Sequence, residues 1–238
     1  MRRDLEAAIL GMYEAIDLAA LAQMVAGHSD KGRRAGITSG KHLDSVAEII
    51  KDDLVRMGFD SDEIYDKGRK CTLPGWFRPT KNWDLLGFDG DELVAAVELK
   101  SISSSFGNNA NNRAEESIGS AFDAQVAYGE GLFGEGDIPP VIGYVMIVRD
   151  CEGSRLRSAA IRSPHFPIDP EFEGTSYLDR FHILCERLRR KSLYNAVWLV
   201  FANPETNEAY EPDPSMSYEV FIKNIEMGLK LHRCQRGL

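Results

Sequence analysis

The sequence predicts an α/β domain in which helices flank a mixed β-sheet. Residues 141–148 and 196–201 are continuous apolar runs, as expected of strands covered on both faces. Helical segments alternate with these strands, which is typical of α/β folds. The chain has 238 residues and no repeat or clear linker, against about 150 residues for a typical domain. We therefore expect residues 1–238 to form a single domain, with residues 1–27 as an N-terminal helical extension.

Apolar residues at helical spacing predict the helices. The third predicted helix begins after Asn112, its expected N-cap, and buries a stripe made of Ile118, Phe122 and Val126. A further short helix is expected at the C-terminus. The four longer helices are predicted at residues 5–25, 42–57, 113–128 and 177–190.

A β-hairpin is predicted over residues 82–101, with residues 89–91 as its turn. A three-residue turn places Asp84 opposite Ala96. Since strand side chains alternate between faces, Glu98 then lies on the same face as Ala96. Asp84 and Glu98 are therefore predicted to be diagonal neighbours, about 7–8 Å apart.

Composition excludes several classes of protein. With 43% hydrophobic and 27% charged residues, the chain is in the ordinary globular range. Its net charge of −9 excludes a polyanion binder held by bulk positive charge, so any nucleic-acid surface must be local. Because no apolar run approaches a membrane span, we expect a soluble intracellular protein without a membrane partner.

The strongest chemical signal is Asp84 together with Glu98-Leu99-Lys100. Two neighbouring carboxylates can bind one Mg²⁺ ion, which prefers a few carboxylate oxygens plus waters and phosphate oxygens. Lys100 would project beside the metal and orient the attacking water, as metal-assisted phosphodiester hydrolysis requires. The alternative is that these are ordinary charges on an exposed strand. Against it, Glu98 and Lys100 interrupt an apolar strand, where an unpaired charge is costly.

This pattern resembles the PD-(D/E)xK nuclease core, in which such a hairpin follows a helix and precedes a helix and a strand. The usual proline before the first acid is replaced here by Trp83. More specifically, residues 104–116, together with residues 38–44 and 183–188, resemble the XhoI family of type II restriction endonucleases. The resemblance covers roughly residues 30–202, and Phe106-Gly107-Asn108-Asn109 followed by Asn111-Asn112-Arg113 is its most specific part.

The resemblance implies a restriction-endonuclease-like core and a magnesium-dependent homodimer of the bacterial cytoplasm. Such a dimer cuts double-stranded DNA at CTCGAG after the first C, and a cognate methyltransferase protects the same site. Asp84 and Glu98 are then the metal ligands, the Leu99 carbonyl supplies a further oxygen, and Lys100 positions the water. Since two-fold DNA sites call for two-fold proteins, the palindrome predicts the dimer.

Asparagine and arginine are the side chains suited to reading adenine and guanine edges. The alternative for the Asn-rich segment is a solvated turn with a helix cap. Ser101 and Ser103 follow the lysine strand, where they would contact backbone phosphates. The predicted DNA-binding residues are Lys41, Ser101, Ser103, Asn108, Asn109, Asn111, Asn112 and Arg113.

Two basic runs, at residues 31–41 and 67–83, would supply phosphate contacts, with a solvated surface as the alternative for each. Glu48 is a candidate for an extra metal-site acid, or else an ordinary solvent-facing helix residue. Two alternative functions stay open: another PD-(D/E)xK DNA endonuclease, acting in repair or on modified DNA, and a catalytically silent DNA-binding module.

Overall fold

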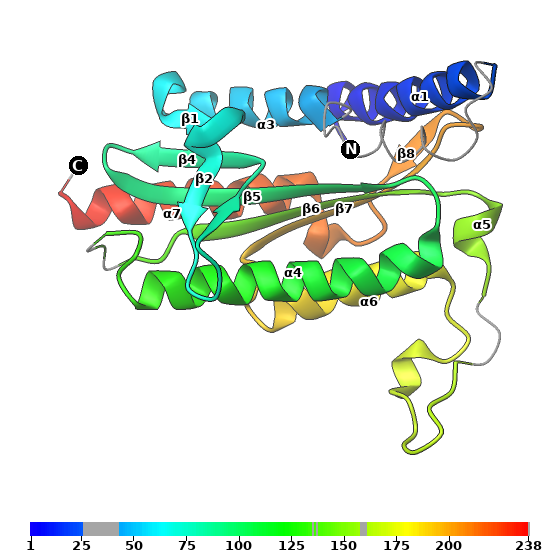
Figure 1. The fold of residues 1–238 in the computed structure, drawn as a ribbon. Coiled ribbons are helices and arrows are strands. Elements are labelled where there is room, and N and C mark those ends of the chain that lie inside the picture. The colour runs from blue at the N-terminus through cyan, green and yellow to red at the C-terminus, as the bar shows by residue number, and fades with distance from the viewer. Residues whose placement is uncertain (26–42, 135, 137, 158–160, 238) are drawn as a thin grey trace.

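The computed structural model of the protein describes residues 1–25, 43–134, 136, 138–157 and 161–237. A six-stranded mixed sheet with strand order β1-β4-β5-β6-β7-β8 lies between two layers of helices (Figure 1). Strands β5, β6 and β7 run parallel, and the other neighbours pair antiparallel. The predicted mixed α/β fold is thus confirmed. The strands of this sheet are β1 (Ile64–Tyr65), β4 (Leu85–Asp89), β5 (Glu92–Ile102), β6 (Val141–Arg149), β7 (Ala196–Asn203) and β8 (Glu208–Tyr210).

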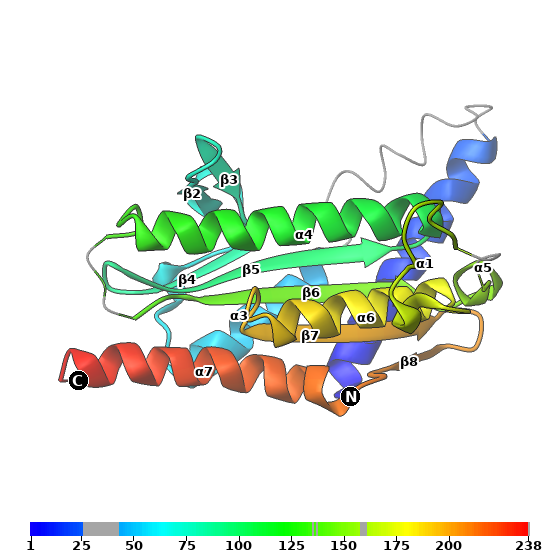
Figure 2. The ribbon, with the colours of Figure 1, turned by 90° about the horizontal axis from the view of Figure 1, so that it is seen from below.

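Different helices cover the two faces of the sheet (Figures 1 and 2). On one face lie α1 (Arg3–Val25), α3 (Asp44–Met57) and α7 (Tyr218–Gln235), which share one apolar cluster with the sheet. On the other face lie α4 (Phe106–Gly129) and α6 (Tyr177–Arg190), which share a second cluster with it. The short helix α5 (Glu152–Arg155) follows β6.

Three predicted helices match the structure closely. The predicted helix 177–190 is confirmed as α6, and the predictions 5–25 and 42–57 differ from α1 and α3 by one or two residues at an end. Leu5, Ile9 and Tyr13 of α1 are fully buried in the first cluster. The C-terminal helix α7 is longer than the short helix expected, because it has 18 residues and packs along the sheet.

Helix α4 corrects the sequence prediction at its start and on its buried side. It begins at Phe106, so Asn112 lies within the helix and is not its N-cap, which is Ser105. Ile118 and Phe122, expected in the core, are 47% and 51% exposed. The buried side consists mostly of small residues, which let the helix approach the sheet closely: Ala110, Ser117, Ser120, Ala121, Ala124 and Ala127.

The hairpin β4–β5 has a different register from the predicted one. Asp89 pairs with Glu92, so the turn has two residues, and a bulge near Gly87 adds one residue on β5. Leu85 therefore pairs with Val97, and continuing this register places Asp84 opposite Glu98 instead of Ala96. The shift is an even number of residues, so Asp84 and Glu98 keep the shared face that the sequence predicted.

A second, two-stranded sheet, formed by β2 (Thr72–Pro74) and β3 (Thr80–Asn82), lies beside α4 (Figure 2). Its connecting loop is anchored to α4 by Asp123, whose carboxylate accepts hydrogen bonds from the backbone N–H groups of Trp76 and Phe77 at 2.9 and 2.7 Å. The Arg78 Nε also donates to Asp123, at 2.7 Å. These bonds hold the loop firmly against the outside of the domain.

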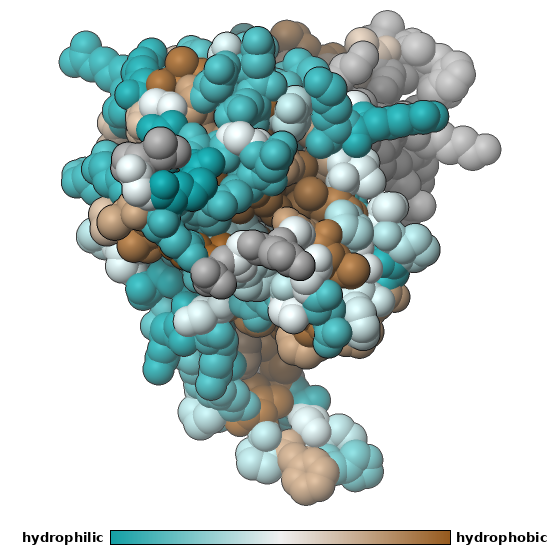
Figure 3. Space-filling view, turned by 90° about the vertical axis from the view of Figure 1, so that its left-hand side faces the viewer, coloured by the Kyte–Doolittle hydropathy of each residue, from teal (hydrophilic) through white to brown (hydrophobic). Residues whose placement is uncertain are grey.

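The end of the molecule that carries the β4–β5 turn is covered mostly by hydrophilic side chains, with small hydrophobic patches between them (Figure 3). Among the described residues, every helix is too short or too polar to cross a lipid bilayer.

Candidate active site

The two predicted acidic ligands meet at the start of the β4–β5 hairpin. The Asp84 N–H donates to the Val97 carbonyl at 3.1 Å, which continues the ladder by one residue. The Leu99 N–H donates to Asp84 Oδ2 at 2.7 Å, so the carboxylate is held against the strand that bears Glu98. The hairpin thus brings together residues that are fourteen apart in the chain, because antiparallel pairing places opposite residues side by side.

Glu98 is the most buried charge of this group, with 3% of its surface exposed. Its Oε1 lies 2.7 Å from Lys100 Nζ and 3.3 Å from Lys81 Nζ. Its Oε2 accepts a hydrogen bond from the Tyr194 hydroxyl at 3.3 Å. A buried carboxylate needs such partners, since an isolated charge in a protein interior costs several kcal/mol or more.

The surroundings shift the pKa values of the Glu98 and Asp84 carboxyl groups in opposite directions. Burial would raise the pKa of Glu98, but Lys100 and Lys81 outweigh it and hold that pKa below its ordinary value. Asp84 is exposed by surface area, but the protein groups crowded around its carboxyl remove part of its hydration and raise its pKa, against the opposing effects of Lys100 and the Leu99 hydrogen bond. Glu98 is therefore kept ionised, whereas Asp84 takes a proton more readily.

A divalent cation fits this donor set. Asp84 and Glu98 offer carboxylate oxygens on one face of the hairpin. They are a pair only, since no group of three or more His, Cys, Asp or Glu side chains that could hold a metal occurs among the described residues. Mg²⁺ is bound in this manner, through one or two carboxylates plus waters and substrate phosphates. The part of the Leu99 carbonyl in metal binding stays a prediction.

A cavity of about 550 Å³ opens beside Glu98. One wall comes from the β2–β3 hairpin through Phe77, Arg78 and Lys81, and the other from α4 through residues that include Glu115 and Glu116.

Two residues of the site were missed by sequence reasoning. Lys81 was noted only as one cation of the basic run 67–83, although it lies three residues before Asp84. Tyr194 is fully buried and lies two residues before β7, and no sequence pattern marked it as a site residue. The contact of Tyr194 with Glu98 joins residues 96 positions apart, which no local pattern reveals.

The predicted DNA-binding residues lie downstream of the acids. Ser101 and Ser103 occupy the end of β5 and the residue that follows it, both partly buried. Lys41, like the whole basic run 31–41, lies outside the described residues. The Asn-rich segment forms the first turns of α4, which was predicted to begin only after Asn112. It contains Asn108, Asn109, Asn111, Asn112 and Arg113.

Several of these side chains have partners within the protein. The Asn109 amide donates to the Ser104 carbonyl at 2.8 Å, and Asn111 accepts a hydrogen bond from Arg180 at 3.4 Å. Arg113 pairs with Glu116 at 2.6 Å. Asn108 and Asn112 are exposed. Their assignment to DNA contacts stays a prediction.

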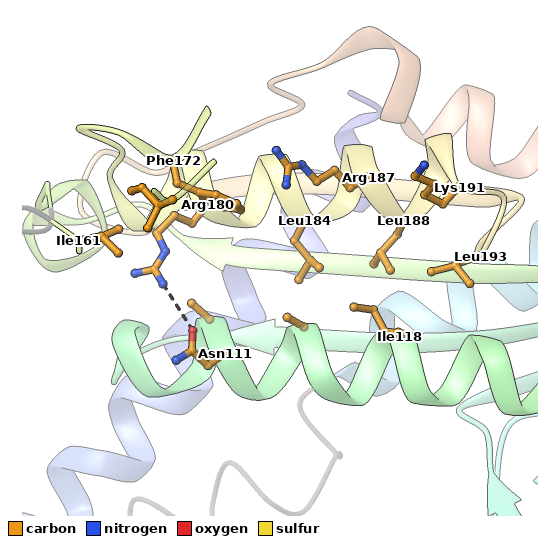
Figure 4. A pocket seen from close by; sticks show the side chains of 13 residues that line it. Asn111, Ile118, Ile161, Phe172, Arg180, Leu184, Arg187, Leu188, Lys191 and Leu193 are labelled. Atoms are coloured by element: carbon orange, nitrogen blue, oxygen red, sulfur yellow. Dashed lines mark hydrogen bonds between the residues drawn. The ribbon is translucent and has the colours of Figure 1, made fainter. Parts of the chain in front are cut away.

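Asn111 and Arg180 also border a second, largely apolar cavity of about 450 Å³ between α4 and α6 (Figure 4). Leu184 and Leu188 of α6 and Ile118 of α4 point into it. This cavity accounts for the partial exposure of Ile118, whereas Phe122 lies at the other cavity and stacks on Phe77.

Glu48 and the basic run 67–83 are also placed by the structure. Glu48 is exposed on α3, which packs against the sheet face opposite to Glu98. Within the run, Lys67 and Arg78 pair with Asp44 and Asp123. Lys70 lies over the Tyr65 ring. The part of this run in phosphate binding stays a prediction.

An acid pair and a lysine on a β-hairpin of a mixed sheet form the arrangement expected of metal-dependent nucleases of the restriction type. The chain matches the family described as restriction endonuclease XhoI over residues 22–211. It belongs to the XhoI restriction endonuclease family, which confirms the resemblance seen in the sequence. No solved structure matches this chain significantly.

Three relatives are type II restriction enzymes by name. XhoI of Xanthomonas vasicola is 48% identical over 162 residues, which are 67% of this chain and 64% of that protein. BstVI of Geobacillus stearothermophilus is 37% identical over 182 residues, 74% of this chain and 80% of that protein. AbrI of Azospirillum brasilense is 44% identical over 145 residues, 60% and 64% of the two chains. The chain thus spans a little under two thirds of the lengths of XhoI and AbrI.

Proposed function

We propose that this protein is a type II restriction endonuclease that hydrolyses double-stranded DNA at CTCGAG, after the first C. The observation that supports this most directly is the placement of Asp84, Glu98 and Lys100 on one face of the hairpin in a chain of this family. Relatives named as type II restriction enzymes support the same activity. The order α3, β1, β4, β5, α4, β6 supports a PD-(D/E)xK core.

In this proposal Asp84 and Glu98 hold Mg²⁺, with the Leu99 carbonyl as a further oxygen. The bound ion supplies charge stabilisation for the phosphorane-like transition state. Lys100, already 2.7 Å from Glu98, orients the attacking water. The water oxygen bonds to phosphorus and gives up a proton to solvent, the bond from phosphorus to the 3′ oxygen breaks, and that oxygen takes up a proton. The products are a 5′-phosphate and a 3′-hydroxyl. Tyr194 fixes the Glu98 carboxylate in the required orientation.

The remaining parts of the proposal concern partners. A palindromic target calls for a homodimer, since each subunit then cuts one strand. The DNA contacts are assigned to Ser101, Ser103, Lys41 and the Asn108–Arg113 segment. Glu48, the predicted extra acid, is left out of the proposed site because α3 lies on the other face of the sheet from Glu98. A cognate methyltransferase would protect the same site, and the bacterial relatives favour a cytoplasmic location.

The test is a digest of a plasmid with a single CTCGAG site, with and without Mg²⁺. We expect one linear product with 5′ TCGA overhangs, formed only with the metal and not from plasmid methylated at the site. Cuts elsewhere would retain the nuclease and discard the target. Binding without cleavage in any divalent metal would favour the silent DNA-binding module.

A further inference from the structure

Two ammonium groups share one carboxylate oxygen in the active site. Lys100 Nζ and Lys81 Nζ lie 2.7 and 3.3 Å from Glu98 Oε1. Lys100 belongs to the same strand as Glu98 and is part of the predicted motif. Lys81 comes from β3, in the separate two-stranded sheet, and nothing in the motif requires it.

Lys81 is costly to keep in this position. Its side chain is only 12% exposed, and its ammonium group lies 4.8 Å from the centre of the Trp83 ring. Since Lys100 already pairs with Glu98 Oε1 at 2.7 Å, a second ammonium group at the same oxygen adds repulsion and desolvation.

The cavity beside Glu98 shows what Lys81 can reach. Lys81 lines this cavity together with Arg78, but Arg78 is already paired with Asp123 at 2.7 Å. The α4 wall contributes Glu115 and Glu116, which repel a phosphate. Of the two cations on the β2–β3 wall of the cavity, Lys81 is therefore the one that can leave its acidic partner and bind an incoming anion.

Charge balance favours such an exchange. Asp84 and Glu98 contribute −2 and Lys81 and Lys100 contribute +2, so the four ionised groups sum to zero. A divalent cation on Glu98 repels the nearby ammonium groups strongly, because Coulomb energies at a few ångströms reach several kcal/mol even at an effective dielectric of about 20. Lys81 makes the longer, and therefore the weaker, of the two lysine contacts with Glu98.

We propose that Lys81 is a further catalytic residue, which leaves Glu98 when the metal binds and contacts the phosphodiester to be cut. This inference rests on the proposed nuclease function. Lys81 would stabilise the negative charge that develops on the phosphate oxygens, while Lys100 stays with the water. The β2–β3 hairpin, anchored to α4 through Asp123, is the support that aims Lys81 into the cavity.

The experiment measures two properties of Lys81→Met that change in opposite directions. Mn²⁺ binding without DNA, followed by calorimetry, should tighten by about tenfold, since a competing buried cation is gone. Single-turnover cleavage of a CTCGAG duplex at saturating metal should slow by about 10²–10³-fold, as when one transition-state donor is removed. Lys223→Met serves as the matched control, because Lys223 is exposed on α7 and pairs only with Glu219. It should change neither property.

Thermal unfolding of each variant separates loss of fold from loss of function, and Lys81→Gln is measured in parallel as a second neutral variant. Unchanged or weaker Mn²⁺ binding in folded variants would overturn the inference, since Lys81 would then be structural. Tighter Mn²⁺ binding with undiminished cleavage would overturn the phosphate contact. If the wild type cuts no DNA with any metal, the proposed function fails, and that result is distinct from either outcome for Lys81.

Discussion

Both faces of the central sheet bury an apolar cluster, but they differ in where buried charges lie. On the α1, α3 and α7 face, the sheet buries large apolar residues such as Trp198, which packs against Tyr218 and Phe221 at ring distances of 4.8 and 6.4 Å. On the α4 and α6 face, the same sheet buries Glu98 beside a cavity, and α4 buries Asp123.

The first face also contains a buried acid, Asp53, but it belongs to a helix and pairs with Arg2, Arg56 and the Tyr218 hydroxyl. Asp89, at the end of β4, is a second buried acid on this side and pairs with Arg233 of α7 and with Arg236, which follows that helix. Glu98 differs from both because it borders the cavity. The comparison teaches that both faces bury an apolar cluster, whereas the α4 and α6 face also places a buried carboxylate of the sheet beside a cavity.

The largest expected effect is on the second face. Asp84→Asn and Lys100→Ala should each reduce cleavage by about 10³-fold or more, because metal-based charge stabilisation provides several kcal/mol. DNA binding, measured by fluorescence anisotropy, should be largely retained, as should the melting temperature. Undiminished cutting by either variant would contradict the assignment of the active site.

The contribution of the first face to the stability of the fold is tested by Trp198→Ala. Trp198 is fully buried, and truncating such a residue costs about 3–5 kcal/mol in unfolding free energy. Urea unfolding monitored by circular dichroism measures this loss. A loss below about 1 kcal/mol would show that this face contributes less to stability than its packing implies.

The charged support of the second face is tested by Asp123→Asn, which should cost about 1–3 kcal/mol because the Arg78 and backbone donors lose an ionised acceptor. Burial opposes ionisation, but Arg78 and the Phe77 and Trp76 N–H groups lower the pKa of Asp123 below its ordinary value of 3.8. A lowered native pKa stabilises the fold above the unfolded pKa and stops doing so as pH falls through the native one.

The difference in unfolding free energy between wild type and Asp123→Asn should therefore be complete above about pH 4 and shrink in more acidic solution. Urea titrations at several pH values check this. A difference that grows on acidification would mean that the carboxylate is not stabilised by these partners.

The smallest expected effects concern the side of α4 that faces the sheet, where the structure differs from the sequence prediction. Phe122→Ala should cost less than about 1 kcal/mol, since Phe122 is 51% exposed. Ala121→Leu should cost about 1–3 kcal/mol, because Ala121 is fully buried and the added atoms overpack the contact with the sheet. If the order of the two were reversed in thermal unfolding, the originally predicted stripe would be the correct one.

Much of the fold could be predicted because it depends on local patterns. Helices α1, α3 and α6 and strands β6 and β7 follow from apolar spacing in short windows of sequence. Helix α4 was misjudged because its large apolar residues were taken as core, whereas the distance between helix and sheet favoured alanine and serine on the buried side. The short strands β1, β2, β3 and β8 have too few residues to show a pattern.

The sequence by itself determined that Glu98 and Lys100 share a face, because they are two residues apart on one strand. It predicted the same face for Asp84 only through an assumed turn, since the register of the hairpin decides this. It also determined the family, through the motif around Phe106 and the Asn-rich segment. Only the tertiary structure decided that Asp84 lies opposite Glu98, because one turn and one bulge set the register. It likewise decided that Lys81 and Tyr194 join the site, since both contacts with Glu98 arise from the packing of elements that are separate in the sequence.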